Sequence, residues 1–189
     1  TIARTTNQVC EGELLQIDNR NNLDLDEKTY TQIITHKTAS LCATCCRLGA
    51  SFAGAAASTV SQMEKFGLCL GIAFQIQDDI LDILGHTSQV GKTLGIDIEK
   101  GKMTLPMIHF MKSAPHEHQE LLRSLLSGRE PDQVEKIRNL ILPSDSIDYA
   151  RQQARQYTQQ ARRAIASLPD SPSKDVLDAM ADFVICRSL

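Results

Sequence analysis

The stretch FQIQDDILDILG, residues 74–85, places three aspartates within an otherwise apolar run. An ionised carboxylate is costly to bury without a partner, so this segment strongly constrains how the chain can pack. At about 100° per residue, Gln75, Asp78, Asp79 and Asp82 fall within one sector of a helix, and the isoleucines fall on the adjacent sector. The carboxylates therefore form a second stripe beside the apolar one and do not interrupt it.

The rest of the chain also has helical periodicity. Clear alternation of apolar and polar residues is absent, and β-branched and aromatic residues are sparse, which argues against strands. Apolar residues recur at helical spacing, and prolines separate the later segments. We expect a helical amino end, a small-residue turn at 49–58, a glycine-rich loop at 85–106, and helices near 26–48, 59–84, 105–112, 117–126, 132–142, 147–168 and 175–187. This pattern predicts one all-α domain over residues 1–189.

Composition excludes two classes of partner. A net charge of -3 lacks the basic footprint of a nucleic-acid-binding protein. No apolar run approaches the roughly 18 residues of a membrane helix, so we expect no transmembrane segment.

Cys42 and Cys45 have C-x-x-C spacing, but no second pair completes a zinc site. We interpret the cysteines as buried free thiols, with Cys45 on an apolar helix face, which favours a reducing, cytoplasmic location.

The aspartate stripe has two interpretations. One is a solvated helix face, which is the usual place for a charge cluster. The other is a Mg²⁺ site, because no Lys or Arg lies three or four residues away to offset the repulsion between Asp78 and Asp82. Hard oxygen ligands clustered in this way suit Mg²⁺ together with substrate phosphates. Under either interpretation, an aspartate-to-asparagine change is expected to leave the metal-free fold intact.

Three lysines suggest an anionic ligand. Lys37 lies near the centre of the apolar stripe of the 26–48 helix, where it either snorkels outward or reaches into a cavity. Lys92 and Lys102 each follow a glycine, which lets the backbone approach a phosphate closely. The segment GHTSQVGKT is one residue too long for a P-loop and follows a helix, so a nucleotide hydrolase is rejected. The combination favours a diphosphate ester with an apolar tail.

Four blocks now carry a family resemblance: GELLQ (12–16), KTASL (37–41), GIAFQIQDDILD (71–82) and GKTLGIDIEKGKMTLP (91–106). Their order and intervals resemble the trans-isoprenyl diphosphate synthases, or polyprenyl synthetases, and within them the bacterial long-chain type such as octaprenyl diphosphate synthase. The resemblance implies long helices around a central cavity, the isoprenoid synthase fold, and usually a homodimer.

The resemblance also implies a reaction. Such enzymes are prenyltransferases that condense isopentenyl diphosphate with an allylic diphosphate and so extend a trans-polyprenyl diphosphate. Mg²⁺ assists ionisation of the allylic diphosphate, and the alkene of isopentenyl diphosphate attacks the resulting cation. Asp78 matches the main metal ligand, and Asp79 and Asp82 match its companions. The matched catalytic positions are Lys37, Thr38 and Gln75, and the matched substrate-binding positions are Lys37, Lys92, Lys102, Gln75 and Phe74.

One departure from the family pattern matters. The family has an earlier aspartate-rich motif, and residues 1–70 contain no D-D-x-x-D. We therefore expect this chain to be the carboxyl-terminal portion of a larger synthase, incomplete for activity by itself. The alternative is a non-catalytic regulatory subunit of a heteromeric prenyl diphosphate synthase. The sequence does not specify the length of the product.

Overall fold

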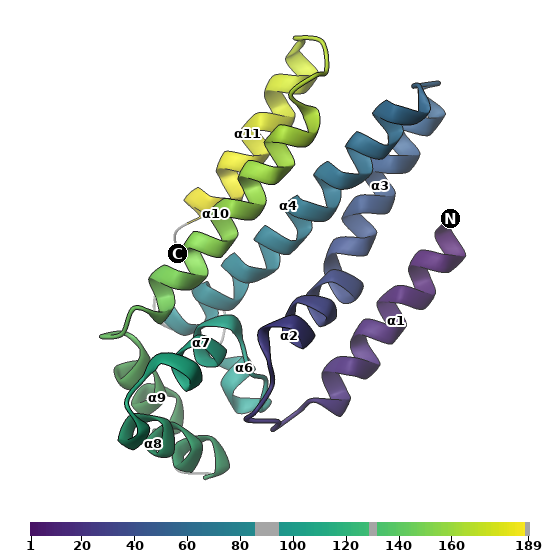
Figure 1. Ribbon diagram of the computed structural model, residues 1–189. Helices are drawn as coiled ribbons and strands as arrows, with labels where there is room; N and C mark the ends of the chain where they lie inside the picture. The colour runs from purple at the N-terminus through teal and green to yellow at the C-terminus, as the bar shows by residue number, and fades with distance from the viewer. Residues whose placement is uncertain (86–94, 129–131, 188–189) are drawn as a thin grey trace.

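The computed structural model describes residues 1–85, 95–128 and 132–187, and its regular structure in these ranges is helical (Figure 1). The elements are α1 (Ile2–Asp18), α2 (Glu27–Ile34), a π-helical turn η1 (Thr35–Ala39), α3 (Ser40–Phe52), α4 (Ala57–Leu84), α6 (Ile96–Glu99), α7 (Leu105–Ser113), α8 (His116–Ser127), α9 (Gln133–Ile141), α10 (Ser146–Ile165) and α11 (Pro172–Cys186). The predicted all-α fold is confirmed.

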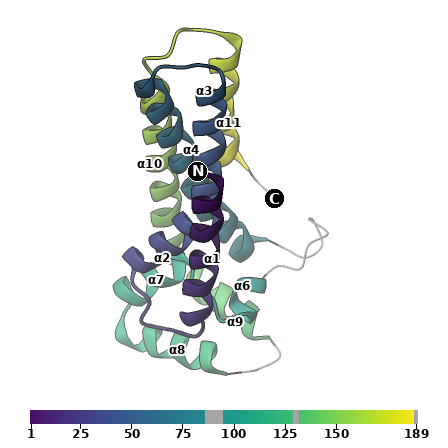
Figure 2. The ribbon, with the colours of Figure 1, turned by 90° about the vertical axis from the view of Figure 1, so that its right-hand side faces the viewer.

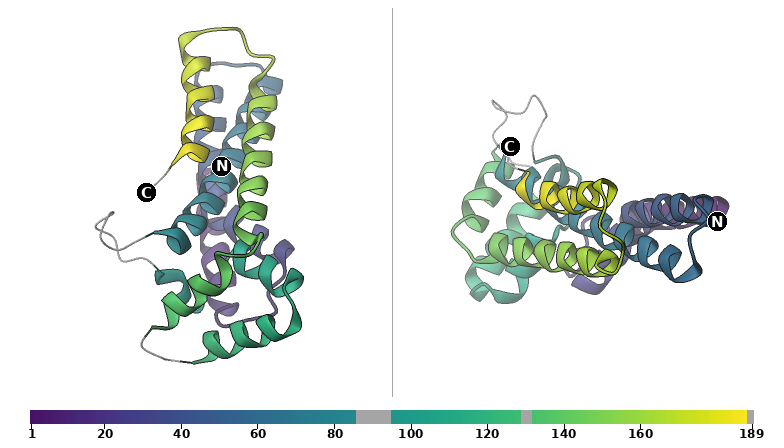
Figure 3. Two further views of the ribbon diagram at one scale, coloured as in Figure 1. Left: turned by 90° about the vertical axis from the view of Figure 1, so that its left-hand side faces the viewer. Right: turned by 90° about the horizontal axis from the view of Figure 1, so that it is seen from above.

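The long helix α4 runs through the middle of the bundle. α10 and α11 pack on one side of it, α3 packs on the other, and α1 lies beyond α3 (Figures 1 and 3). The shorter helices α6 to α9 gather at one end of the bundle (Figure 2). The aspartate-rich segment forms the last turns of α4, next to this end.

Two clusters of buried side chains fill the space around α4. The larger contains isoleucines of α4, such as Ile76 and Ile80, together with α2 and the short helices. The smaller joins Phe66 and Ala73 of α4 to α10 and α11. The buried face of α10 consists largely of alanines, which let its backbone approach α4 closely.

Glycines bring α3 and α4 together. A Cβ built on Gly67 would lie 2.5 Å from the carbonyl oxygen of Cys42, and one on Gly71 would lie 2.7 Å from the Cα of Ala39. Both obstacles are backbone atoms, which cannot move aside as a flexible side chain can. The close approach of α4 to α3 at Gly67, and to η1 at Gly71, therefore requires glycine at both positions.

The single helix expected at 26–48 is wrong in detail. Asp26 caps α2 by accepting a hydrogen bond from the backbone N–H of Thr29, but the π turn η1 then interrupts the α-helical spacing. A π turn contains more residues than an α turn. Residues that a spacing of 3.6 per turn would place on one face therefore lie on different faces before and after η1. The apolar stripe predicted for this helix also included Leu41. Leu41 is 55% exposed and Cys45 is exposed, so neither lies in the core as expected.

The cysteines differ from the expectation as a set. Cys69 is buried, Cys42 and Cys46 are half-buried, and the remaining three are exposed free thiols: Cys10, Cys45 and Cys186. The interpretation of the group as buried thiols therefore holds only for Cys69 among the six, and the π turn accounts for the exposure of Cys45 alone.

The expected loop at 85–106 is partly helical, because α6 forms within it. Gly95 and Gly101 flank this short helix with φ angles of 75° and 66°, in the left-handed region that favours glycine. α4 ends as expected at Gly85, although that residue is extended and not left-handed. Lys92 falls outside the described residues.

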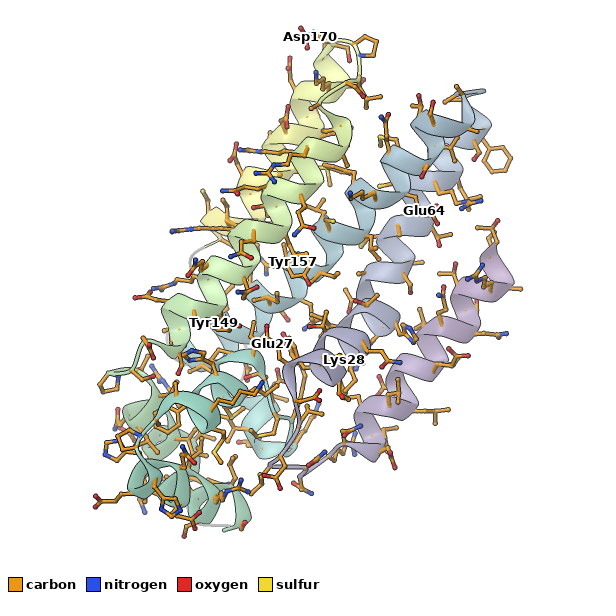
Figure 4. The ribbon with its side chains drawn as sticks, in the orientation of Figure 1. Glu27, Lys28, Glu64, Tyr149, Tyr157 and Asp170 are labelled. Atoms are coloured by element: carbon orange, nitrogen blue, oxygen red, sulfur yellow. The ribbon has the colours of Figure 1, made fainter. Side chains whose placement is uncertain are left out.

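A hydrogen bond from α10 fixes the start of α2. The hydroxyl of Tyr149 donates to both carboxylate oxygens of Glu27, at 3.0 and 2.8 Å (Figure 4).

Within the described ranges, none of the helices is both long and apolar enough to cross a membrane.

The packing of α3 on α4 yields a stability prediction. We expect Gly67→Ala to lower the free energy of unfolding by about 1–3 kcal/mol, because the methyl group overlaps backbone atoms of α3. The matched control is Gly49→Ala in α3, where a Cβ meets nothing within 4 Å and should raise stability by about 0.5–1 kcal/mol. Urea unfolding of both variants checks the prediction, and a neutral or stabilising Gly67→Ala would contradict it.

Candidate functional site

The site is built around Asp79, whose side chain is fully buried on α4. One carboxylate oxygen, Oδ2, accepts a hydrogen bond from the Tyr30 hydroxyl at 2.7 Å. The other, Oδ1, accepts from Gln75 Nε2 at 2.9 Å and from Lys102 Nζ at 3.0 Å. Three donors from α2, α4 and the segment after α6 thus converge on one buried carboxylate, which offsets the cost of burying its charge.

Lys102 bridges Asp79 to a second carboxylate. Its ammonium also lies 3.0 Å from Oδ2 of Asp97, and its side chain is only 16% exposed. Burial by itself would lower the pKa of Lys102, but the charges of Asp79 and Asp97 outweigh it and raise that pKa above its ordinary value. Lys102 is therefore a permanent cation that is already neutralised by two acids.

Asp82 and Asp97 share a crowded polar region. Asp82 Oδ2 accepts a hydrogen bond from the backbone N–H of Asp97 at 3.1 Å, which fixes the start of α6 on the end of α4. Burial, which is the main cause, raises the pKa of both carboxyls, and each is raised further by the charge of Asp79. Additional positive charge here would therefore be favourable.

Asp78 is the most open of the three predicted acids. Its side chain is 51% exposed, and Oδ1 lies 3.7 Å from Nη2 of Arg187. The three aspartates thus occupy different environments: Asp79 is internal, Asp82 is half-buried, and Asp78 is half-exposed. An aspartate-to-asparagine change was expected to leave the fold intact at all three positions. The structure changes this expectation for Asp79, because an uncharged asparagine cannot accept hydrogen bonds from all three of its donors as well as the carboxylate does.

Two of the matched catalytic positions, Thr38 and Gln75, are in contact. Thr38 Oγ1 donates to Gln75 Oε1 at 3.0 Å, and Gln75 in turn donates to Asp79. Phe74, 38% exposed, lies under the guanidinium of Arg187, whose Cζ is 4.7 Å from the ring centroid. The structure therefore places two of the predicted catalytic residues beside the acidic residues.

Lys37 has a different set of partners. Its ammonium lies 2.6 Å from Oε2 of Glu13 and donates to Oε1 of Gln16 at 3.2 Å, so it is directed toward α1. Hydrogen bonding by Lys37 is the main cause that lowers the pKa of Glu13. The predicted contact with a diphosphate stays a prediction for Lys37 and for Lys102.

Sequence reasoning missed three residues of this site: Tyr30, Asp97 and Arg187. The apolar stripe of the 26–48 helix includes Tyr30, yet its hydroxyl is a buried donor, and burial followed by the charge of Asp79 raises its pKa well above the ordinary value. Asp97 was detectable in principle from its place five residues before Lys102. No local pattern connects Arg187 with α4.

Comparison with known proteins identifies the family. A model of the family described as "Polyprenyl synthetase" matches residues 1–142. The chain belongs to the polyprenyl synthetase family. It is 32% identical over 180 residues to the short chain isoprenyl diphosphate synthase of Methanothermobacter thermautotrophicus, covering 95% of this chain and 55% of that protein. It is also 32% identical over 188 residues to the octaprenyl diphosphate synthase of Haemophilus influenzae, covering 99% and 57%. The expected likeness to octaprenyl diphosphate synthases is confirmed.

Solved structures agree with this family assignment. A polyprenyl synthase from Caulobacter crescentus, complexed with calcium and isoprenyl diphosphate, matches with a TM-score of 0.90 at 33% identity, covering 98% of this chain and 57% of that one. A decaprenyl diphosphate synthase from Rhodobacter capsulatus gives a TM-score of 0.89 at 32% identity, with 97% and 57% covered. This polyprenyl synthetase chain therefore spans somewhat more than half the length of the relatives it matches.

The buried carboxylate gives a prediction for Tyr30. We expect Tyr30→Phe to lower the free energy of unfolding by about 1–3 kcal/mol, because Oδ2 of Asp79 loses its donor in a buried place. Tyr149→Phe is the matched control: it also removes a hydroxyl bonded to a carboxylate, but Glu27 there is less buried, so a smaller loss is expected. Equal losses in urea unfolding would contradict the central place given to Asp79.

Proposed function

We propose that the protein acts in prenyl chain elongation, condensing isopentenyl diphosphate with an allylic diphosphate to extend a trans-polyprenyl diphosphate. The observation that carries the proposal is the adjacency of Thr38 and Gln75 to the acidic residues at the end of α4. Membership of the polyprenyl synthetase family supports this reaction class. The polyprenyl synthase from Caulobacter crescentus, whose structure is a complex with calcium and isoprenyl diphosphate, supports the ligand class.

The cofactor of the proposed reaction is Mg²⁺. No cluster of at least three His, Cys, Asp or Glu side chains within the described ranges is arranged to hold a metal ion. The donor chemistry nevertheless fits, because Asp78 and Asp82 lie one helical turn apart and burial disfavours the charge of Asp82, raising its pKa. Mg²⁺ usually binds through one or two carboxylates and completes its coordination with water and substrate phosphates. Asp78 and Asp82 would therefore hold the ion, and Asp79, engaged by three donors, would hold α4 and Lys102 in position.

When bound, Mg²⁺ would supply positive charge to the diphosphate, and this charge would favour breaking of the allylic C–O bond. The bonding electrons leave with the diphosphate, and an allylic cation remains. Thr38 and Gln75 present polar oxygens without a strong nucleophile, which suits a site that must stabilise a cation without capturing it. The alkene carbon of isopentenyl diphosphate bonds to the cation, and loss of a proton restores a double bond.

Two further proposals concern the assembly. We propose that the chain is the carboxyl-terminal portion of a larger synthase, which agrees with the share of its relatives that it spans. We also propose a homodimer, as the family resemblance implies. Leu14 and Ile17, 65% and 47% exposed, line a groove of about 630 Å³ beside α2, which is available to such an interface or to the rest of the larger synthase. The comparisons lend no support to a non-catalytic regulatory subunit.

The proposed function is tested by turnover. We expect the complete synthase to convert isopentenyl diphosphate and farnesyl diphosphate to longer products with Mg²⁺. Asp78→Asn should lower the rate on the order of a hundredfold, the scale seen when one preorganised electrostatic group is removed. The matched control is Asp148→Asn, a change to an exposed acid on α10 that pairs with Arg151 three residues along. Radiolabelled product formation against Mg²⁺ concentration is the measurement.

Two results would contradict the proposed function. One is the absence of product from the complete synthase under all Mg²⁺ concentrations. The other is wild-type turnover with wild-type Mg²⁺ dependence in Asp78→Asn, which would make the aspartates a purely structural feature of α4.

A further inference from the structure

The carboxyl end of the described chain lies on the aspartate-rich turns of α4. The backbone carbonyl of Arg187 accepts a hydrogen bond from Gln77 Nε2 at 3.1 Å, and Gln77 is a buried residue of α4. The backbone N–H of Arg187 donates to the carbonyl of Phe183, which continues the hydrogen bonding of α11 by one residue. Two separate bonds thus fix the position from which the Arg187 side chain extends.

The Arg187 side chain is directed at Asp78. Its Nη2 lies 3.7 Å from Oδ1, and its guanidinium stacks over Phe74, one turn earlier on α4. The side chain is only 23% exposed, so its charge is partly removed from water and the interaction with Asp78 is less screened than a surface pair. The chain itself therefore supplies a cation to the most open aspartate of the cluster.

This contact is loose by the standards of an arginine–carboxylate pair. At 3.7 Å it is longer than a good N–H···O bond, and a bidentate pair is not formed. Nη1 of Arg187 is buried and has no hydrogen-bond partner among the described residues. A donor that is buried without a partner costs free energy, so the arrangement neutralises charge but is not the tightest that these two groups can form.

We propose that Arg187 is the resident counter-ion of Asp78, and that it competes with a divalent cation for this carboxylate. The inference rests on the proposed function, because it takes Asp78 as the open end of the metal site. Asp78 and Asp82 repel each other when both are charged, and Arg187 offsets that repulsion in the metal-free protein. A divalent ion brings more charge to the same carboxylates, so its binding displaces the guanidinium. The metal affinity of the free protein is thereby lowered by a residue at the far end of the sequence.

The competition is measured with Mn²⁺ as the probe, on the 189-residue chain without substrate. Free Mn²⁺ is counted by electron paramagnetic resonance during titration of wild type, Arg187→Gln and Arg187→Lys. Arg151→Gln on α10 is the matched control, since it removes the same charge from an exposed pair with Asp148. Asp78→Asn identifies binding at this site, and urea unfolding of each variant verifies that it is folded.

We expect Arg187→Gln to bind Mn²⁺ about two- to fivefold more tightly than wild type, the range that follows from removing one partly screened ion pair. Arg187→Lys and Arg151→Gln should stay close to wild type, and Asp78→Asn should lose the binding. Detectable binding in Arg187→Gln with none in wild type supports the same conclusion.

Unchanged or weaker binding in Arg187→Gln, with Mn²⁺ still bound at Asp78 in wild type, overturns the competition and leaves the proposed function in place. A similar gain in Arg151→Gln also overturns it, because the effect would then follow net charge alone. Absence of Mn²⁺ binding in both wild type and Arg187→Gln overturns the inference, whereas the metal role of Asp78 in the proposed function is judged separately by the turnover of Asp78→Asn.

Discussion

The fully buried carboxylate of Asp79, paired with Lys102, is the interaction on which the rest of the site depends. Removing two charges from water is expensive, and their attraction repays the cost only when the remaining hydrogen-bonding capacity is also used. Here Tyr30 and Gln75 use that capacity on Asp79, and Asp97 uses it on Lys102. The pair therefore connects α2, α4 and the segment after α6, which are far apart in sequence, in one required arrangement.

The same pair separates the roles of the three aspartates. Asp79 cannot turn outward without leaving Lys102 and two neutral donors unsatisfied, so it serves as an internal anchor. Asp82 accepts a hydrogen bond from the backbone of α6, and Asp78 pairs with a loosely placed arginine, Arg187. Asp78 and Asp82 are consequently more available to a hard cation than Asp79, although the sequence motif has the same residue, aspartate, at all three positions.

The sequence predicted the fold class well because helical periodicity is a local property. The helix expected at 59–84 is observed as α4, and the later helices fall close to their expected ranges. The π turn η1 could not be foreseen, since its extra residue leaves no mark in the apolar spacing, and Leu41 and Cys45 were misplaced for that reason. Thr38 and Gln75 are in hydrogen-bond contact, and the catalytic role that the resemblance implies for them stays a prediction.

Partners that come from distant segments were beyond the sequence argument. The sequence shows no nearby Lys or Arg around Asp78 and Asp79, and the cations arrive from Lys102 and Arg187, which lie on other elements. Spacing on one helix predicts which side chains share a face. It does not predict which of them the tertiary structure buries, and burial is what distinguishes Asp79 from Asp78.

The most direct test compares the metal-free stability of two adjacent variants, Asp79→Asn and Asp78→Asn, by urea unfolding in the presence of a chelator. The account predicts that Asp79→Asn lowers the free energy of unfolding by about 1–3 kcal/mol, because the buried Lys102 then keeps only one of its two charged partners, Asp97, within the described residues. Asp78→Asn should change it by less than about 0.5 kcal/mol. Equal and small effects at both positions would contradict the claim that the Asp79–Lys102 pair organises this end of the bundle.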